Sequence, residues 1–253
     1  MERALSFGAV AEAYERFRPD YPYAIVTLAA DAAEGAVITA VEVGAGTGKA
    51  TRVFARAGIE ITATEPDEAM LAVLTRVCAG LPVRPMSARF EDLDPARLGT
   101  FDLLYAAAAW HWTDPATRMD RAAALVRPGG AVALLGGPAE IADERLATTE
   151  AELTARYLPG GASIPPPTTG TGGLDWPGDD LLADRRFEDV RQRVIQRRYT
   201  VAREDHLGYL RTVSAYRLMS GGDRRALFDE LRAALPDEVA VEADIVVHTA
   251  RRV

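Results

Sequence analysis

The sequence predicts an α/β fold built around a doubly wound, mostly parallel sheet. Strand-like apolar runs alternate with amphipathic helical patterns through the first half of the chain, and such alternation is typical of parallel sheets with right-handed crossovers. A turn with three glycines, Gly44, Gly46 and Gly48, joins one predicted strand to the next helix. The 253 residues, 48% of them hydrophobic, suit one large domain spanning residues 1–253.

Two helices are predicted before the first strand. Apolar side chains between Ala9 and Phe17 share one helical face, and Pro19 stops that pattern. A second helix is expected from about Tyr23 to Ala33. These elements are predicted to form an N-terminal helical cap over residues 1–35.

The central elements then alternate. Strands are predicted at residues 37–43, 59–64, 82–87, 101–106 and 131–136, and helices at residues 47–57, 67–78 and 115–127. Asp67 is the expected N-cap of the second of these helices. Asp114 and Pro115 are the expected cap and first-turn residue of the third.

The last part of the chain departs from this rhythm. Residues 159–178 contain five prolines and six glycines, too many for a helix or a strand interior. A helix is expected to begin near Glu204, ahead of Gly221, and residues 187–198 and 241–251 alternate as two final strands. Long irregular connections are often lids, so residues 138–186 and 203–222 are predicted to form an inserted substrate cover, with Trp176 as an anchor. The alternative is a long connecting loop with ordinary packing helices.

The glycine turn indicates a nucleotide-type cofactor site, because glycine lets the backbone approach a ligand and the following helix offers free N–H groups. A P-loop would need glycine at Val43 and serine or threonine at Ala50. A dinucleotide fingerprint would need a small residue at Lys49. Neither pattern is present.

Glu65 is the predicted partner of this turn. It lies 21 residues after Gly44, at the end of the next predicted strand. A carboxylate at this spacing can accept hydrogen bonds from a ribose diol.

These residues resemble a known family. The run Val41-Glu42-Val43-Gly44-Ala45-Gly46-Thr47-Gly48 is similar to motif I of the class I S-adenosylmethionine-dependent methyltransferases, and Glu65 matches their ribose-binding acid. Residues 101–106 and 125–134 resemble the fourth strand and the turn into the fifth. The resemblance implies a seven-stranded Rossmann-like sheet with one antiparallel strand, and S-adenosylmethionine as cofactor, with S-adenosylhomocysteine as product. It extends to enzymes of the trans-aconitate type, mostly in the cofactor half.

The resemblance also assigns cofactor contacts. Arg18 would bind the methionine carboxylate, because an arginine fork suits that group, and Tyr14 would close the pocket. Arg89 stands where the family commonly has an acid for the adenine amine, so the backbone of Phe90 and the carboxylate of Glu91 are the candidates there. The full predicted set of cofactor-binding residues is Tyr14, Arg18, Glu42, Gly44, Ala45, Gly46, Gly48, Glu65, Pro66, Met70, Phe90, Glu91, Ala106, Ala107 and Trp110.

The reaction implied is an in-line displacement at the sulfonium methyl group, for which positioning in a dry site supplies much of the acceleration. Small residues after Tyr105 would let the backbone approach the methionine amine. His111 is the candidate general base, since imidazole titrates near neutrality. Packing of a following helix is the alternative role for this stretch.

Composition argues against several other classes of function. The net charge of −8 disfavours nucleic-acid binding, and the widely spaced histidines His111, His206 and His248 predict no metal site. Cys78 is the single cysteine, which suits a reducing cytoplasm, and no signal peptide or membrane span is expected. The expected protein is a cytoplasmic monomer or homodimer that methylates an oxygen or nitrogen atom of a small molecule. The alternative is a cofactor-binding protein with a sensing or non-methylating role.

Overall fold

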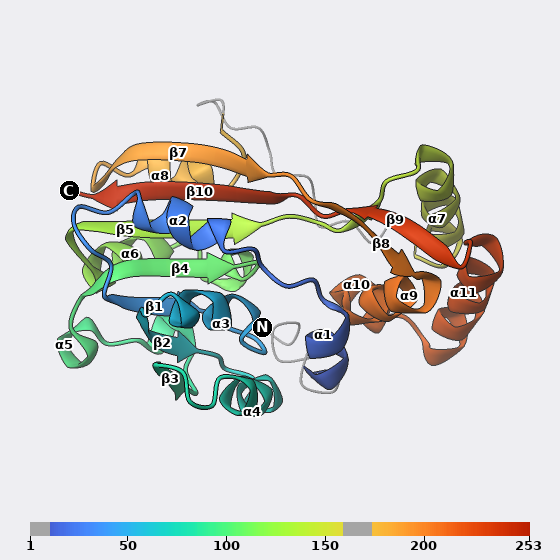
Figure 1. Ribbon diagram of the computed structural model, residues 1–253, viewed down its shortest axis with the longest axis horizontal. Coiled ribbons are helices and arrows are strands. Elements are labelled where there is room, and N and C mark those ends of the chain that lie inside the picture. The colour runs from blue at the N-terminus through green and yellow to red at the C-terminus, as the bar shows by residue number, and fades with distance from the viewer. Residues whose placement is uncertain (1–10, 159–173) are drawn as a thin grey trace. The chain divides into compact units, whose positions relative to one another are not determined.

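The computed structural model describes residues 11–158 and 174–253, and the chain forms two compact units. The larger unit contains residues 20–136, 167–195 and 246–253, and the smaller contains residues 1–19, 137–166 and 196–245. Figure 1 labels the elements of both. The first ten residues of the predicted cap and residues 159–173 of the predicted cover lie outside the described residues.

The larger unit is built on a seven-stranded sheet in the order β3-β2-β1-β4-β5-β10-β7. Strands β1 to β5 pair in parallel, and β10 runs antiparallel to β5. The predicted mostly parallel, seven-stranded Rossmann-like sheet is therefore confirmed. Its strands are β1 (Thr39–Val43), β2 (Glu60–Thr64), β3 (Val83–Met86), β4 (Phe101–Ala107), β5 (Val126–Gly136), β7 (Phe187–Ile195) and β10 (Ile245–Arg252).

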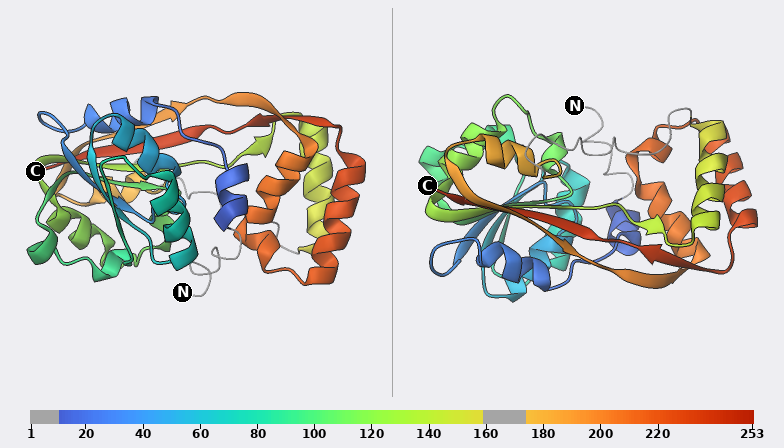
Figure 2. Two further views of the ribbon diagram at one scale, coloured as in Figure 1. Left: turned by 60° about the horizontal axis from the view of Figure 1, so that its bottom comes forward. Right: turned by 90° about the horizontal axis from the view of Figure 1, so that it is seen from above.

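Helices cover both faces of this sheet, as in a doubly wound fold. Its helices are α2 (Ala24–Ala30), α3 (Lys49–Arg56), α4 (Glu68–Val77), α5 (Pro95–Leu98), α6 (Arg118–Leu125) and α8 (Gly178–Ala183). Helices α2 and α3 lie on one face, and α6 and α8 lie on the other (Figure 2). Because side chains alternate along a strand, β4 contributes to the apolar core on each face of the sheet. Leu104 packs in the cluster that includes Leu181 of α8. Tyr105 stacks on Phe54 of α3, with ring centroids 4.1 Å apart.

The helix caps explain where two central helices begin. The Asp67 side chain accepts hydrogen bonds from the amides of Ala69 and Met70, which confirms the predicted cap of α4. Asp114 caps a separate turn, because its Oδ1 accepts from the amide of Ala116 at 3.0 Å and its carbonyl accepts from the amide of Thr117 at 3.1 Å. Helix α6 therefore begins at Arg118, three residues later than predicted.

The smaller unit combines a three-stranded antiparallel sheet with five helices among its described residues. Its apolar core includes Leu207, Leu227 and Val239. A Cβ atom at Gly208 would lie 2.6 Å from the ring of Phe17, so α1 and α9 pack closely there. The elements are α1 (Ala11–Phe17), β6 (Glu140–Ile141), α7 (Glu144–Tyr157), β8 (Arg198–Ala202), α9 (Arg203–Thr212), α10 (Ser214–Arg217), α11 (Gly221–Ala234) and β9 (Glu238–Glu242).

The prediction of two uninterrupted final strands is wrong. Residues 187–198 divide between β7 and the start of β8, and residues 241–251 divide between the end of β9 and β10, so each predicted strand contributes to two different sheets. Side-chain alternation continues through both breaks, which is why periodicity does not reveal them. The structure interrupts the pairing where the amide of Arg197 donates to Asp244 Oδ1 at 2.8 Å and the Arg197 carbonyl accepts from Ala243 at 2.9 Å.

The helix predicted near Glu204 is confirmed, but it ends at Thr212 and a short α10 follows. Gly221 and Gly222 begin the 14-residue α11. The hydroxyl of Ser220 accepts from the amide of Asp223 and caps that helix. A serine cap thus outweighs the low helix propensity of the two glycines.

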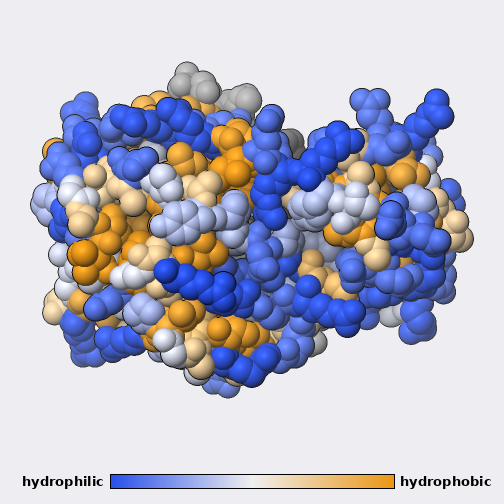
Figure 3. Space-filling model, in the orientation of Figure 1, coloured by the Kyte–Doolittle hydropathy of each residue, from blue (hydrophilic) through white to orange (hydrophobic). Residues whose placement is uncertain are grey.

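Surface composition is mixed. On the face shown in Figure 3, polar and charged residues surround smaller apolar areas. The exposed large apolar side chains among the described residues belong to separate elements, for example Ile38 before β1, Leu182 on α8 and Val194 on β7. Across residues 11–158 and 174–253, no helix has both the length and the apolar character that crossing a membrane requires.

Candidate functional site

The glycine turn lies at the carboxyl end of β1, between that strand and α3. Gly44, Gly46 and Gly48 all have positive φ, at 65°, 58° and 89°. Residues other than glycine rarely adopt this conformation. A Cβ atom at Gly44 would lie 2.6 Å from the Cβ of Ala109, whereas one at Gly46 would meet nothing within 4 Å. The turn is therefore packed against the end of β4 at Gly44 and is open to an approaching ligand at Gly46.

Glu65 ties this turn to the end of β2. Its Oε2 accepts from the Gly46 amide at 2.8 Å, and its Oε1 accepts from the Asp67 amide at 2.9 Å. Burial raises the pKa of Glu65, although both backbone hydrogen bonds oppose that rise. The carboxylate is thus fixed in orientation, and each oxygen keeps a further lone pair with which it can accept from a diol.

Glu42 is buried beneath the turn, at the carboxyl end of β1. Its Oε2 accepts from the hydroxyl of Thr51 at 2.5 Å and from the hydroxyl of Tyr105 at 2.9 Å. Burial raises the pKa of Glu42 to about 8, against the lowering effect of these two hydrogen bonds. Glu42 is therefore largely protonated at neutral pH and joins β1, α3 and β4 through a neutral network.

The end of β4 approaches the turn closely. Ala106 is buried, Ala107 is partly buried, and Ala108 has a φ of 54°, in the region that favours glycine. The amide of Ala108 donates to the carbonyl of Leu135 at 2.7 Å. Backbone strain of this kind concentrates at functional sites, and it brings Ala109 against Gly44.

Trp110 and His111 follow in a short 3-10 turn, Trp110–Trp112. Trp110 is buried and packs on Phe90 with ring centroids 5.6 Å apart. Its indole N–H is buried and has no hydrogen-bond partner among the described residues. His111 is partly exposed, and burial lowers its pKa, so its imidazole is neutral near pH 7 and can accept a proton.

The residues predicted near the adenine lie around the ends of β2 and β3. Met70 is buried on α4, one turn after Pro66. Phe90 begins a second 3-10 turn, Phe90–Asp92, and its ring is buried. Glu91 is already engaged, since its Oε1 accepts from the amide of Asp114 at 2.9 Å and its Oε2 lies 3.5 Å from Arg89. Adenine contacts by these residues stay predictions.

Tyr14 and Arg18 belong to the smaller unit. Arg18 donates from Nε to the hydroxyl of Thr212 at 2.8 Å and from Nη2 to the Thr212 carbonyl at 3.3 Å. Its guanidinium also lies over the rings of Tyr14 and Tyr209. The predicted carboxylate contact of Arg18 stays a prediction, and it would compete with these partners.

The larger unit thus brings 14 of the 16 predicted site residues, from Glu42 to His111, to the edge where β1, β2, β3 and β4 end. Sequence reasoning did not single out Thr51 as a partner of Glu42, Ala108 and Ala109 as the contact of the turn, or Asp20 and Lys49, which are paired at the start of α3. A basic residue at the first position of α3 was the available signal for the last pair. Within the described ranges, no three His, Cys, Asp or Glu side chains are grouped so that they could hold a metal ion.

Known proteins that are similar to this chain include methyltransferases. Residues 41–134 match the family model of a methyltransferase domain. An uncharacterized methyltransferase of Mycobacterium tuberculosis is 36% identical over 145 residues, which cover 57% of this chain and 56% of that protein. The chain thus matches a little over half the length of this curated relative.

Solved structures extend the likeness to nearly the whole chain. A structure described as a candidate type II methyltransferase from Anaeromyxobacter dehalogenans is 27% identical, with a TM-score of 0.62, over 93% of this chain and 98% of that one. A S-adenosylmethionine-dependent methyltransferase from Thiobacillus denitrificans, solved with S-adenosylhomocysteine, shares the fold at 19% identity and a TM-score of 0.50, over 98% of each chain. The trans-aconitate subtype finds no support among these relatives. Residues 41–134 are thus similar to a methyltransferase domain, and nearly the whole chain is similar to a solved methyltransferase.

Proposed function

We propose that this protein transfers the methyl group of S-adenosylmethionine to an oxygen or nitrogen atom of a small molecule, by in-line displacement. The observation that carries the proposal is the junction of Gly46 and Glu65 at the carboxyl ends of β1 and β2, beside the strained end of β4 at Ala108. When bound, the cofactor supplies a methyl group made electrophilic by its sulfonium. The protein has to hold that group, orient the acceptor and exclude water.

Each side of the site has a role in this proposal. Glu65, fixed by two backbone amides, accepts from the ribose hydroxyls. The backbone at Gly46 and at Ala107 approaches the cofactor, because neither position carries a bulky side chain. Pro66, Met70, Phe90 and Glu91 surround the adenine, and Arg18 and Tyr14 meet the methionine carboxylate.

His111 is proposed to take the proton from the acceptor. Burial lowers its pKa, so the neutral imidazole that a general base requires is present at physiological pH and persists below pH 6.5, its ordinary pKa. The rate of transfer should therefore stay high into mildly acidic solution. His111→Asn should lower the transfer rate by roughly 100-fold, while affinity for the cofactor stays unchanged.

The acceptor is proposed to be small because residues 138–186 and 203–222 are proposed to cover it. Trp176, at the end of the first of these segments, packs on the core of the larger unit. The net charge of −8 disfavours nucleic acid as the acceptor. A cytoplasmic location and a monomeric or homodimeric state complete the proposal.

The test begins with calorimetric titration of the purified chain with S-adenosylmethionine and S-adenosylhomocysteine. Binding of both, followed by transfer of isotopically labelled methyl to members of a panel of phenols, amines and carboxylates, is the expected result. A chain that binds neither cofactor contradicts the proposal. Binding without transfer to any acceptor would favour the alternative, a sensing or non-methylating protein of the same family.

A further inference from the structure

Lys49 carries a buried positive charge at an unfavourable place. It is the first residue of α3, directly after Gly48, and its side chain is only 8% exposed. The N-terminus of a helix has a partial positive charge, which disfavours a cation there. A buried ammonium also costs free energy unless it is paired. This position therefore requires an anionic partner.

Asp20 is that partner. Lys49 Nζ lies 2.9 Å from Asp20 Oδ1, and Arg52, one turn further along α3, reaches the same oxygen from Nη2 at 3.2 Å. Burial acts to raise the pKa of Asp20, but the hydrogen bonds and charges of Lys49 and Arg52 oppose it and the pKa is lowered overall. Asp20 is thus ionised at neutral pH and bound to the first turn of α3.

This ion pair also has a positional effect. The Asp20 side chain is 71% exposed, so solvent screens its half of the pair and weakens the attraction compared with a fully buried pair. Asp20 lies outside any helix or strand, so the contact fixes a stretch of irregular chain. Held to Lys49, the backbone at residue 20 has a defined place beside α3.

Both ends of the pair are adjacent to predicted cofactor contacts. Lys49 follows Gly48, the last glycine of the turn, and Asp20 follows Arg18 by two residues. Lys49 thus lies where the glycine turn meets α3, so its tether to Asp20 restrains the first turn of α3 directly after Gly48.

We propose that Lys49 and Asp20 are positioning residues for S-adenosylmethionine: their ion pair fixes residue 20 to the first turn of α3 and so preorganises the glycine turn, without touching the cofactor. This inference rests on the proposed function. It predicts that the two residues act as one unit in cofactor binding.

The test is a double-mutant cycle on affinity for S-adenosylhomocysteine, measured by calorimetry on the full chain. Lys49→Met and Asp20→Asn should each raise the dissociation constant about tenfold, and the double variant should raise it no further, because coupled residues are non-additive. Lys49→Arg and Asp20→Glu, which keep the charges, should restore most of the affinity. Urea unfolding should show that all variants remain folded.

A matched control is available at the opposite end of the sheet. Arg127 Nε pairs with Asp102 Oδ1 at 2.6 Å, so Arg127→Met removes another ion pair of the larger unit and should leave the affinity unchanged. Unchanged affinity in Lys49→Met and Asp20→Asn, or losses that add in the double variant, would overturn the inference while the proposed function stands. If the unmodified chain binds neither cofactor form, the proposed function fails first.

Discussion

The two ends of the seven-stranded sheet handle charge in opposite ways. At the carboxyl ends of β1 and β2, Glu42 and Glu65 are buried carboxyls whose pKa values burial raises. At the amino ends of the parallel strands of the same sheet, Asp102 has a pKa of about 2, because hydrogen bonds from Arg127, Thr39 and Ile38 outweigh its partial burial.

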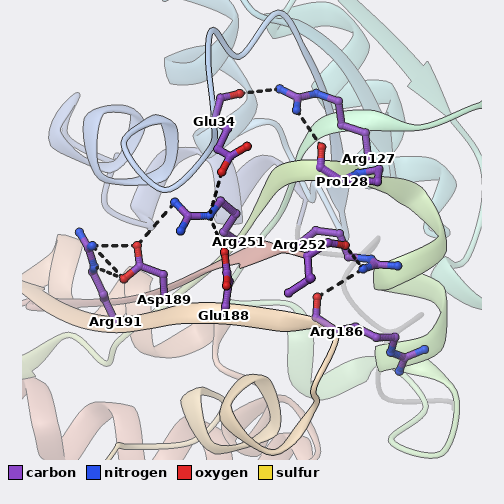
Figure 4. Close-up of polar contacts among 10 residues, drawn as sticks. Glu34, Arg127, Pro128, Arg186, Glu188, Asp189, Arg191, Arg251 and Arg252 are labelled. Atoms are coloured by element: carbon purple, nitrogen blue, oxygen red, sulfur yellow. Dashed lines mark hydrogen bonds and ion pairs between the residues drawn. The ribbon is translucent and has the colours of Figure 1, made fainter.

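The network at the amino end is extensive. Figure 4 shows Arg251 of β10 between Glu34, Glu188 and Asp189, and Arg127 bonded to the carbonyls of Glu34 and Pro128. Glu34, Glu188 and Asp189 each pair with Arg251 there, and Asp102 pairs with Arg127. The acids at one end of the sheet thus have arginine partners, whereas Glu42 and Glu65 at the other end are buried and accept hydrogen bonds from neutral amides and hydroxyls. Acids with perturbed pKa values of this kind are common at functional sites.

The largest expected effect is at the glycine turn. Gly44→Ala should lower the free energy of unfolding by about 2–4 kcal/mol, because alanine is strained at a φ of 65° and its Cβ would overlap that of Ala109. Gly58→Ala is the matched control, with positive φ but open space around the new Cβ, and it should cost only about 1–2 kcal/mol. Equal losses in urea unfolding would show that the close contact with Ala109 has no energetic weight.

The second effect concerns ligand binding at the same end. Glu65→Ala should weaken binding of S-adenosylhomocysteine by about 1–3 kcal/mol, because a charged hydrogen-bond partner is removed. Glu68→Ala, an exposed acid on the first turn of α4, should leave the affinity unchanged. Calorimetric titration of both variants provides the measurement, and an unaltered Glu65→Ala affinity would remove Glu65 from the ribose site.

At the amino ends of the strands, a substitution should change stability and leave cofactor affinity unchanged. Asp102→Asn should lower the free energy of unfolding at neutral pH by about 1–2 kcal/mol, since the charged carboxylate that accepts a hydrogen bond from Arg127 Nε is lost, and cofactor affinity should not change. The lowered pKa of Asp102 means that its contribution is present above its ordinary value of 3.8 and disappears as the pH falls through about 2. A loss of affinity in this variant would break the division between the two ends.

The last prediction concerns how the stability of Glu42→Gln depends on pH. The folded state holds the Glu42 proton with a pKa of about 8, against an ordinary value of 4.5. Its stabilisation is therefore complete below the ordinary value and is lost as the pH rises through about 8. Glutamine cannot ionise, so from about pH 4.5 to about pH 8 the variant should lose less stability than the unmodified chain, by at most about 1.4 kcal/mol per pH unit. Parallel urea-unfolding profiles for the two proteins would contradict the raised pKa.

Much of the larger unit could be predicted from the sequence. The strand-turn-helix pattern around Gly44 to Gly48, the spacing to Glu65 and the cap at Asp67 are local features whose chemistry has few alternatives. The final strands could not be divided correctly, because periodicity reports which side chains alternate and carries no information about which sheet a strand joins. The start of α6 was missed for a similar reason. An aspartate followed by a proline can begin either a helix or an isolated turn, and here it begins a turn that precedes α6.

Within the candidate site, the sequence indicated candidate residues but not how they pair. The sequence alone determined a doubly wound fold, a glycine turn after the first strand and an acid, Glu65, after the second, since each depends on short-range geometry. Only the tertiary structure decided that Glu42 shares its proton network with Thr51 and Tyr105, that Ala109 closes on Gly44, and that Lys49 meets Asp20. Those contacts join residues of different elements, most of them far apart in the chain. The burial that sets their pKa values and strain exists only once the elements have packed together.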